Sequence, residues 1–240
     1  MILEKISAFK FSYKLRGCMT NKATIKEVFT SIQGEGPYIG YKQLFIRFSG
    51  CNLNCNYCDT VHKGANCQDY SVEDLIAEIN KHSDCNSISL TGGEPLLQAG
   101  FLKEFLPQSP LPVYLETNAT LAGELAEVID YIDYVSADIK LPSCTGGHEL
   151  WDTHNRFFEV AAHKNLFAKV VFDENITEDE ISNCCKLAAK HNAELILQPM
   201  MFNEKPAVNK DFMEKILDKF LVKYKKTRLI PQVHKFLNIR

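Results

Sequence analysis

Three cysteines lie close together in the segment FSGCNLNCNYCDT, at Cys51, Cys55 and Cys58. Intervals of three and then two residues let one loop, placed after a predicted strand, bring the three thiolates together. Thiolates are ligands for soft metals. One candidate is a structural zinc with His62 as fourth ligand, and the other is a [4Fe–4S] cluster with one iron open to a substrate or cofactor. The spacing favours the cluster and leaves zinc as the alternative.

A second chemical segment is Gly92-Gly93-Glu94-Pro95, which directly follows the predicted strand Ser87–Thr91. Glycines lack a Cβ atom, so a backbone can approach a ligand closely there. The Glu94 carboxylate beside exposed main-chain groups suits a ligand that carries an amine. The segment also falls at the carboxyl end of a strand, where α/β barrels bind ligands. We therefore expect a binding site here, although a lone Gly-Gly pair would favour a simple turn.

The composition is that of an ordinary globular protein. Of 240 residues, 45% are hydrophobic and 24% are charged, enough to form a sizeable core. The net charge of -3 argues against a chain built mainly to bind nucleic acid or an anionic membrane. The sequence has no run of about 18 apolar residues and no secretory signal, so we expect a cytoplasmic protein.

Nine cysteines are many for a chain with no export signal. An odd number excludes a complete set of intramolecular disulfides, and the cytosol would keep thiols reduced in any case. Free cysteine is among the most buried residue types. We therefore expect only packing roles for Cys18, Cys67, Cys85, Cys144, Cys184 and Cys185.

The elements that position these segments are short apolar strands that alternate with amphipathic helices. We expect strands at Lys26–Thr30, Gln43–Phe48, Ser87–Thr91, Pro112–Thr117, Tyr134–Ile139, Phe167–Phe172, Glu194–Gln198 and Thr227–Gln232. Apolar patterns typical of helices begin after Ser71 and after Thr177, which are the expected N-caps. A third helix is expected at Phe212–Phe220. The alternation predicts an α/β fold with a mainly parallel sheet, a complete or partial barrel. Residues 1–22 are expected to form an N-terminal extension and 23–240 the core domain.

The cysteine loop, Tyr57 before its last cysteine and the Gly-Gly-Glu-Pro segment resemble the radical S-adenosylmethionine superfamily. The resemblance implies a partial (β/α) barrel and a [4Fe–4S] cluster on the three cysteines. It also implies S-adenosylmethionine bound at the open iron and cleaved to a 5′-deoxyadenosyl radical. In such enzymes the cofactor carries the radical chemistry, while the protein orients the reactants and excludes water.

Five further segments narrow the resemblance. They are Thr30–Pro37, Glu116–Asn118, Ser136–Lys140, Gln198–Met200 and Pro231–Lys235. In this order, across nearly the whole chain, they are similar to the 7-carboxy-7-deazaguanine synthase family of lyases. The similarity implies a Mg²⁺-dependent ring contraction of 6-carboxy-5,6,7,8-tetrahydropterin with loss of ammonia, in the pathway to queuosine and related deazapurines.

The resemblance also implies residue roles, none of them catalytic beyond the cluster and the cofactor. Residues expected at the S-adenosylmethionine site are Tyr57, Asp59, Gly93, Glu94, Ser136, Asp138, Lys140, Gln198 and Met200. Residues expected at the pterin site are Ile32, Gln33, Gly34, Glu35, Arg47, Thr91, His234 and Arg240 with its α-carboxylate. Thr60 is the implied Mg²⁺ ligand, and Asp59 is the more obvious ligand by charge, so the choice stays open.

Physical chemistry supports two of these roles. An ionised Glu35 carboxylate facing ring N–H donors would form charge-assisted hydrogen bonds. The alternative for Glu35 is a solvated turn residue. Arg47 stands in an otherwise apolar strand and needs a partner, and a substrate carboxylate would match its bidentate fork. A structural salt bridge is the alternative for Arg47.

Basic residues dominate the end of the chain. No acidic residue follows Asp218, whereas Lys219, Lys223, Lys225, Lys226, Arg228, Lys235 and Arg240 do. This run predicts a solvated helix end and tail, or a docking patch for an acidic reducing partner such as flavodoxin. Nucleic-acid binding is disfavoured because aromatic residues are not interleaved as a stacking platform requires. The resemblance implies a homodimer.

Two other functions stay open at this point. A glycyl-radical activating enzyme would share the cluster and the glycine motif but act on a protein. The Gln-Gly-Glu-Gly loop and the Pro231–Lys235 run argue against it. A non-enzymatic zinc or iron–sulfur binding module is the second possibility, and metal analysis distinguishes it because a cluster brings about four irons per chain.

Overall fold

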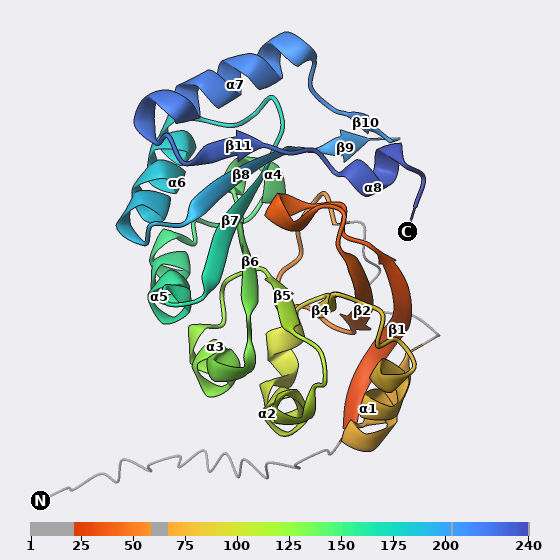
Figure 1. The fold of residues 1–240 in the computed structure, drawn as a ribbon. Helices are drawn as coiled ribbons and strands as arrows, with labels where there is room; N and C mark the ends of the chain where they lie inside the picture. The colour runs from red at the N-terminus through yellow and green to blue at the C-terminus, as the bar shows by residue number, and fades with distance from the viewer. Residues whose placement is uncertain (1–21, 59–66, 203, 240) are drawn as a thin grey trace, which may run out of the picture.

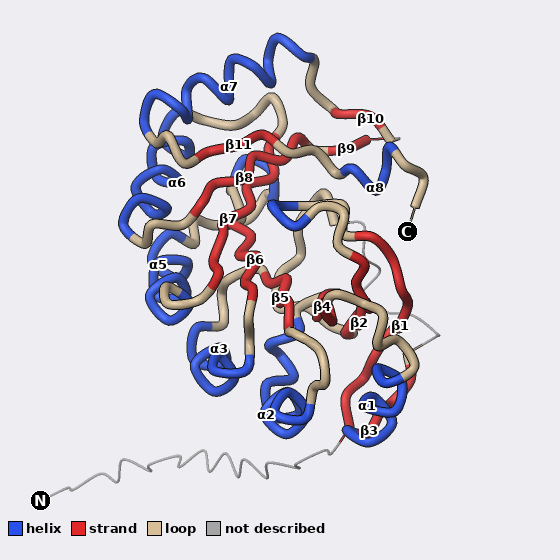
Figure 2. The backbone as a smooth tube through the Cα atoms, viewed as in Figure 1, coloured by secondary structure: helices blue, strands red, loops and turns tan. Residues whose placement is uncertain are grey.

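Seven parallel strands make up most of a curved sheet in the computed structural model, which describes residues 22–58, 67–202 and 204–239. In spatial order they are β2 (Lys42–Phe48), β4 (Ser87–Gly92), β5 (Val113–Thr117), β6 (Tyr134–Ile139), β7 (Asn165–Phe172), β8 (Glu194–Pro199) and β11 (Thr227–Leu229). The sheet does not close on itself within the described residues, since β11 and β3 lie at opposite ends of the strand order. Figures 1 and 2 show the resulting arc. The expected partial barrel with a mainly parallel sheet is confirmed.

Two antiparallel strands extend the sheet beyond β2. They are β1 (Lys22–Ile32), which pairs with β2, and β3 (Gln68–Ser71), which pairs with β1. A parallel crossover needs about a dozen or more residues, and the loop 33–41 is too short for one. β1 and β2 therefore form a hairpin, an exception to the predicted alternation. Because β1 begins at Lys22, that residue belongs to the sheet, and the rest of the expected N-terminal extension lies outside the described residues.

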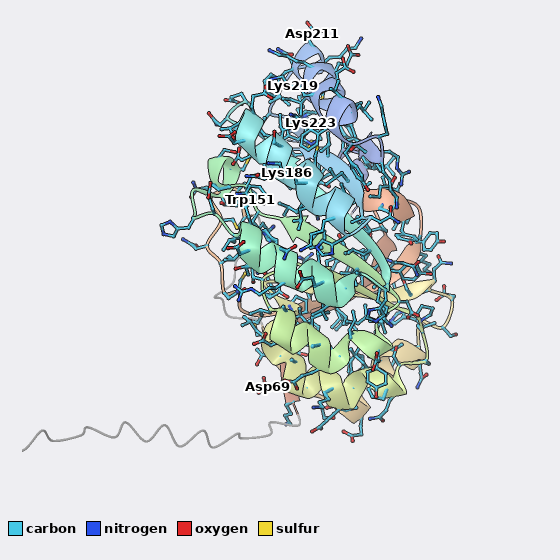
Figure 3. The ribbon with its side chains drawn as sticks, turned by 90° about the vertical axis from the view of Figure 1, so that its left-hand side faces the viewer. Asp69, Trp151, Lys186, Asp211, Lys219 and Lys223 are labelled. Carbon is cyan, nitrogen blue, oxygen red and sulfur yellow. The ribbon has the colours of Figure 1, made fainter. Side chains whose placement is uncertain are left out.

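Helices cover the outer face of the sheet. They are α2 (Ala99–Phe105), α3 (Ala122–Val128), α5 (Trp151–Ala161), α6 (Glu178–Lys190) and α7 (Lys210–Lys223). Figure 3 shows them stacked along that face, with Lys186, Lys219 and Lys223 on the outer helical surface. The central strands are buried along almost their whole length, as expected for a parallel sheet covered by helices.

Side-chain caps set the beginnings of the predicted helices. Ser71 and Asp74 form a capping box at α1 (Val72–Asn80), and Thr177 and Glu180 form one at α6. Each box satisfies backbone N–H groups that lack a partner in the first turn. Asn209 caps α7 in a similar way.

An aromatic cluster lies inside the barrel near the starts of the strands. Tyr38, in the short helix η1 (Gly36–Tyr38), packs edge-on against Tyr114 and Tyr134, with ring centroids 5.9 and 4.6 Å away. Gly36 has φ of 66°, and a Cβ atom there would lie 2.7 Å from the Phe167 ring. Only glycine fits comfortably in such a position. The cluster thus anchors the loop that carries Gln33 and Glu35.

Four of the six cysteines outside the three-cysteine loop are buried, as expected for packing roles. They are Cys85, Cys144, Cys184 and Cys185. Cys67 is partly exposed, and Cys18 lies outside the described residues. No helix in the described part of the chain is long and apolar enough to cross a membrane.

The remaining short elements connect or terminate the sheet. They are α4 (Pro142–Thr145), α8 (Val233–Phe236), the strands β9 (Met201–Phe202) and β10 (Lys205–Pro206), and the 3₁₀ turns η2 (Pro95–Gln98), η3 (Leu106–Gln108) and η4 (Ile129–Tyr131). Of these, α8 matters most for the site, because it returns across the carboxyl edge of the sheet (Figure 1).

Candidate active site

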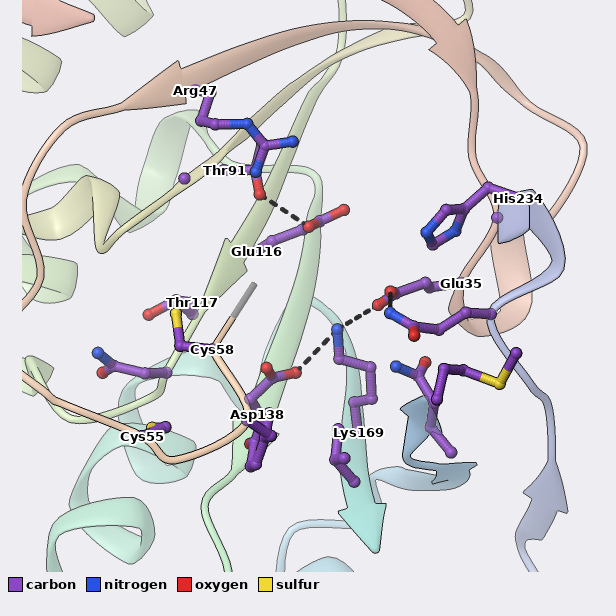
Figure 4. Close-up of a pocket in the computed structure, with 18 of the residues that line it drawn as sticks. Glu35, Arg47, Cys55, Cys58, Thr91, Glu116, Thr117, Asp138, Lys169 and His234 are labelled. Carbon is purple, nitrogen blue, oxygen red and sulfur yellow. Dashed lines mark hydrogen bonds and ion pairs between the residues drawn. The ribbon is translucent and has the colours of Figure 1, made fainter. Parts of the chain in front are cut away.

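A cavity of about 260 Å³ opens at the carboxyl edge of the parallel strands. Its walls come from the ends of β2, β4, β5, β6, β7 and β8, from the loop after β1, and from α8. The carboxyl ends of parallel strands share one edge, so residues far apart in sequence meet there. Figure 4 shows side chains from these elements pointing toward one another across the cavity.

The cysteine loop forms one wall. Cys51, Cys55 and Cys58 all line the cavity. Cys51 Sγ accepts hydrogen bonds from Leu53 N at 3.4 Å and from Asn118 Nδ2 at 3.7 Å, contacts that would stabilise a thiolate. Partial burial raises the pKa of the Cys51 and Cys55 thiols. In the described residues no three Cys, His, Asp or Glu side chains converge as a single metal ion requires.

The two glycines of the Gly-Gly-Glu-Pro segment bring main chain to the cavity. Gly92 has φ of 122°, and a Cβ atom on it would lie 2.3 Å from the Phe48 carbonyl oxygen. Gly93 N donates to that same oxygen at 3.1 Å, which ties the segment to the start of the cysteine loop. Both glycines line the cavity, as expected.

The side chain of Glu94 does something other than the sequence indicated. It is fully buried and does not line the cavity. Its carboxylate accepts from Leu96 N, Thr117 Oγ1 and Asn118 N at 3.2, 2.9 and 2.8 Å. Burial raises the pKa of Glu94 to about 7 despite these bonds. The Glu94 carboxylate therefore links the end of β4 to the end of β5 through hydrogen bonds and is not available to a ligand.

The opposite wall is the loop after β1, covered by the C-terminal tail. Ile32, Gln33, Gly34 and Glu35 all line the cavity. Gly34 O accepts from Val233 N at 2.9 Å, and a Cβ atom on Gly34 would lie 2.5 Å from His234 Nδ1. Gln232 Nε2 donates to Glu35 Oε1 at 2.6 Å. The tail is thus seated on the loop and turns His234 into the cavity.

Glu35 is an enclosed ion-pair partner, which excludes the solvated-turn alternative. Its Oε2 pairs with Lys169 Nζ. Burial raises the pKa of Glu35, but the Lys169 charge and hydrogen bonds from Gln232 and Lys169 outweigh it and bring the pKa to about 2. Glu35 is therefore an anion at neutral pH. A carboxylate has about four lone-pair sites, so it can accept further bonds from a ligand.

Arg47 makes the structural ion pair that was its alternative role and also reaches the cavity. Its Nε lies 2.7 Å from Glu27 Oε1, directly across the hairpin. The guanidinium lies 5.8 Å from the centroid of the Phe29 ring, which stacks on Phe45. Only Nε is bonded to Glu27 in the hydrogen bonds described, so the two terminal nitrogens can still form a fork with a carboxylate.

Two charged residues at the cavity, Glu116 and Lys169, were not assigned roles from the sequence. Glu116 accepts from Gln33 Nε2 and Thr91 Oγ1, both at 2.9 Å, and burial raises its pKa. Lys169 lies mid-strand in β7 with only 7% of its surface exposed. A lysine in the apolar run Phe167–Phe172 needs buried partners, which is the one signal that marks it in the sequence.

The other expected site residues divide into three groups. Tyr57, Thr91, Asp138, Lys140, Gln198 and Met200 line the cavity. Ser136 is buried and does not line it. Asp59, Thr60, His62 and Arg240 lie outside the described residues.

Comparison with known proteins decides the family. Residues 45–164 match the model of the Radical SAM superfamily. The 7-carboxy-7-deazaguanine synthase of Geobacter sulfurreducens is 36% identical over 242 residues, covering 90% of this chain and 97% of the relative. This chain belongs to the 7-carboxy-7-deazaguanine synthase family.

Further relatives agree with the family assignment. The 7-carboxy-7-deazaguanine synthase of Archaeoglobus fulgidus is 36% identical and covers 91% of this chain and 100% of the relative. The structure of QueE from Escherichia coli shares the fold, with a TM-score of 0.62 at 21% identity over 90% of this chain and 96% of the other. Methylornithine synthase (PylB) also shares it, with a TM-score of 0.51 at 11% identity, over 76% and 63% of the chains.

The cavity fits the cofactors that a synthase of this family implies. Three thiols line it, and one of them, Cys51 Sγ, accepts from a main-chain and an amide donor that would stabilise a thiolate. Two buried acceptors, Asp138 Oδ1 and Gln198 Oε1, have no hydrogen-bond partner among the described residues. Buried acceptors without partners are costly, and the amine and hydroxyl groups of S-adenosylmethionine are suitable donors for them. The residues present therefore fit both the cluster and S-adenosylmethionine.

Replacing Gly92 by alanine tests the role of the close backbone approach. We expect Gly92→Ala to lower the free energy of unfolding by about 1–3 kcal/mol or more, because of its positive φ and the overlap with Phe48 O. It should also weaken S-adenosylmethionine binding. Urea unfolding and equilibrium dialysis of the reconstituted protein measure the two effects.

Gly100→Ala is the matched control. Gly100 lies in α2, and a Cβ atom there would meet nothing within 4 Å. Alanine is the better helix former by about 1 kcal/mol, so stability should stay equal or rise. If the Gly92 and Gly100 variants had the same free energy of unfolding and the same affinity for S-adenosylmethionine, the close backbone approach at Gly92 would have no role in folding or binding.

Proposed function

We propose that this chain converts 6-carboxy-5,6,7,8-tetrahydropterin to 7-carboxy-7-deazaguanine, with loss of ammonia, as a step toward queuosine or a related deazapurine. The cofactors would be a [4Fe–4S] cluster, S-adenosylmethionine and Mg²⁺. The family membership and the names of the relatives support this reaction.

One observation supports the proposal most strongly: a single cavity contains both sets of residues that the reaction needs. The three cysteines, Gly92 and Gly93 line it. Glu35, Arg47, Thr91, Glu116 and His234 line the same cavity, and Figure 4 shows Glu35 and His234 across it from Cys55 and Cys58. A substrate between them would have its reacting ring beside the radical source.

Arg47 would bind the substrate carboxylate. Its guanidinium is already oriented by Glu27 and by the Phe29 ring, so little conformational freedom is lost on binding. A bidentate guanidinium–carboxylate pair would then fix the orientation of the ring carbon that bears the carboxylate.

The rest of the polar lining matches a pterin, whose ring edge carries several N–H donors. Glu35 and Glu116 supply acceptors, and Glu116 is held in place by Gln33 and Thr91. His234 and the tail segment on Gly34 would cover the substrate and exclude water. When bound, the reduced cluster and S-adenosylmethionine supply the radical that removes a hydrogen atom from the ring carbon bearing the carboxylate.

The Mg²⁺ site and the protein partners are further parts of the proposal. Thr60, or Asp59, would bind Mg²⁺ together with the substrate carboxylate. A reducing partner such as flavodoxin is needed to supply electrons, and a homodimer is expected from the family.

The C-terminal basic run gives limited support for a docking patch, because Lys219 pairs with Glu178 and Arg228 with Glu194. Lys235 instead lines the cavity.

Anaerobic turnover tests the function. Reconstituted protein incubated with the carboxypterin, S-adenosylmethionine, Mg²⁺ and a chemical reductant should form the deazaguanine product without any partner protein. Cys55→Ala should abolish product and cluster absorbance together, because the cluster needs all three thiolates. A colourless protein with one zinc, or a holoprotein with no turnover, would overturn the proposal. Cys184→Ala is the control, since that thiol is buried in the core.

Arg47→Met tests the carboxylate contact. Loss of a charged hydrogen-bond pair costs about 1.5–3 kcal/mol, so KM for the carboxypterin should rise about tenfold or more. A pterin with a carboxamide in place of the carboxylate separates binding from folding. The native protein should discriminate strongly against the carboxamide and Arg47→Met only weakly. Unchanged discrimination in the variant would exclude Arg47 as the carboxylate ligand. Arg228→Met, which removes an exposed pair with Glu194, should change neither value.

A further inference from the structure

Lys169 lies at the centre of a chain of charged contacts that crosses the cavity floor. Its Nζ pairs with Glu35 Oε2 on one side and lies 3.2 Å from Asp138 Oδ1 on the other. Figure 4 shows the ammonium group between the two carboxylates. Glu35 belongs to the proposed pterin side of the cavity and Asp138 to the proposed S-adenosylmethionine side. Lys169 is therefore a direct physical link between them.

The chain of contacts continues beyond both carboxylates. Asp138 Oδ2 accepts from Lys140 Nζ at 2.8 Å, and Lys140 Nζ lies 3.3 Å from the hydroxyl of Tyr57 in the cysteine loop. At the other end, Gln232 of the C-terminal tail donates to Glu35. The tail, the substrate loop, β7, β6 and the cysteine loop are thus joined by consecutive hydrogen bonds and ion pairs.

The contact on the Asp138 side is weaker than that on the Glu35 side. Lys169 Nζ forms a hydrogen bond with Glu35, whereas its approach to Asp138 Oδ1 is an ion pair without hydrogen-bond geometry. Asp138 Oδ1 is consequently a buried acceptor with an unfilled site. Oδ2 of the same carboxylate is held by Lys140, and the Lys169 ammonium, which is bonded to Glu35, is the contact of Oδ1 with the pterin side of the cavity.

We propose that Lys169 is a positioning residue that couples the two ligands, so that binding of the pterin strengthens binding of S-adenosylmethionine. This inference rests on the proposed function. A pterin bound to Glu35 would fix that carboxylate, and through it the Lys169 ammonium and Asp138. The second ligand then meets a carboxylate that is already ordered, which gives positive coupling. Linkage requires the effect to be reciprocal, so S-adenosylmethionine also strengthens pterin binding.

The coupling factor is the direct readout, because a merely structural role for Lys169 would lower both affinities without changing their mutual dependence. It is the Kd of S-adenosylmethionine without pterin divided by its Kd at saturating pterin. Equilibrium dialysis of the unreduced, cluster-loaded protein gives both values with no turnover. Iron content and circular dichroism confirm that each variant is loaded and folded.

We expect the native protein to show a coupling factor of about fivefold or more. Lys169→Met should bring it to about one, and Lys169→Arg, which keeps the charge, should retain most of it. Glu35→Gln removes the ion pair with Lys169 from the Glu35 side, and it is the variant to use if Lys169→Met does not fold. It should bring the factor toward one. Lys190→Met, which removes an exposed pair with Glu159, is the control and should behave as the native protein.

A factor of one in the native protein, or an unchanged factor in both Lys169→Met and Glu35→Gln, would overturn the coupling role while leaving the proposed function intact. Failure of the native protein to bind the pterin at all would instead overturn the proposed substrate, and the coupling with it.

Discussion

One buried ammonium group, that of Lys169, allows several carboxylates to line the inside of this barrel. Glu35 pairs with it directly, Asp138 lies 3.2 Å away, and its charge also acts on Glu116. Burial lowers the pKa of Lys169, but the charges of Asp138, Glu35 and Glu116 outweigh it and raise that pKa well above its usual value. An unpaired charge in such a place would be strongly destabilising. The polar cavity at the carboxyl edge therefore depends on this ion-pair cluster as much as on the parallel strands around it.

The position of the cavity follows from the strand topology. Strands joined by right-handed crossovers bring their carboxyl ends to one edge, and at that edge the cysteine loop, Gly92, Glu116, Asp138 and Gln198 meet. The antiparallel β1 adds the remaining wall, because its hairpin loop joins the start of β2 and enters the barrel from the amino ends of the strands, where Tyr38 anchors it in the aromatic cluster. The tail then closes over Gly34.

The sequence predicted the parallel strands well because each is a short apolar run bounded by turn residues. It predicted α1 from a helical apolar pattern after the N-cap Ser71, and α6 from the capping-box spacing of Thr177 and Glu180. It could not predict that Glu94 turns inward, since that depends on where β5 places Thr117 and Asn118. The same holds for Ser136, which is buried in β6 and does not line the cavity. Lys169 was missed because a lysine in an apolar strand signals only that it needs buried partners, and those partners, Glu35 and Asp138, come from distant segments. For Arg47 both sequence alternatives described part of the outcome, an ion pair with Glu27 and a place at the cavity.

The central claim is that this cavity holds the carboxypterin against S-adenosylmethionine so that hydrogen passes between them and S-adenosylmethionine is regenerated. The most direct test uses carboxypterin that carries deuterium at the ring carbon bearing the carboxylate. After anaerobic turnover, mass spectrometry of the recovered S-adenosylmethionine should show deuterium in its 5′ position, with no net consumption of the cofactor. Product formation with no deuterium in the recovered S-adenosylmethionine would contradict the account.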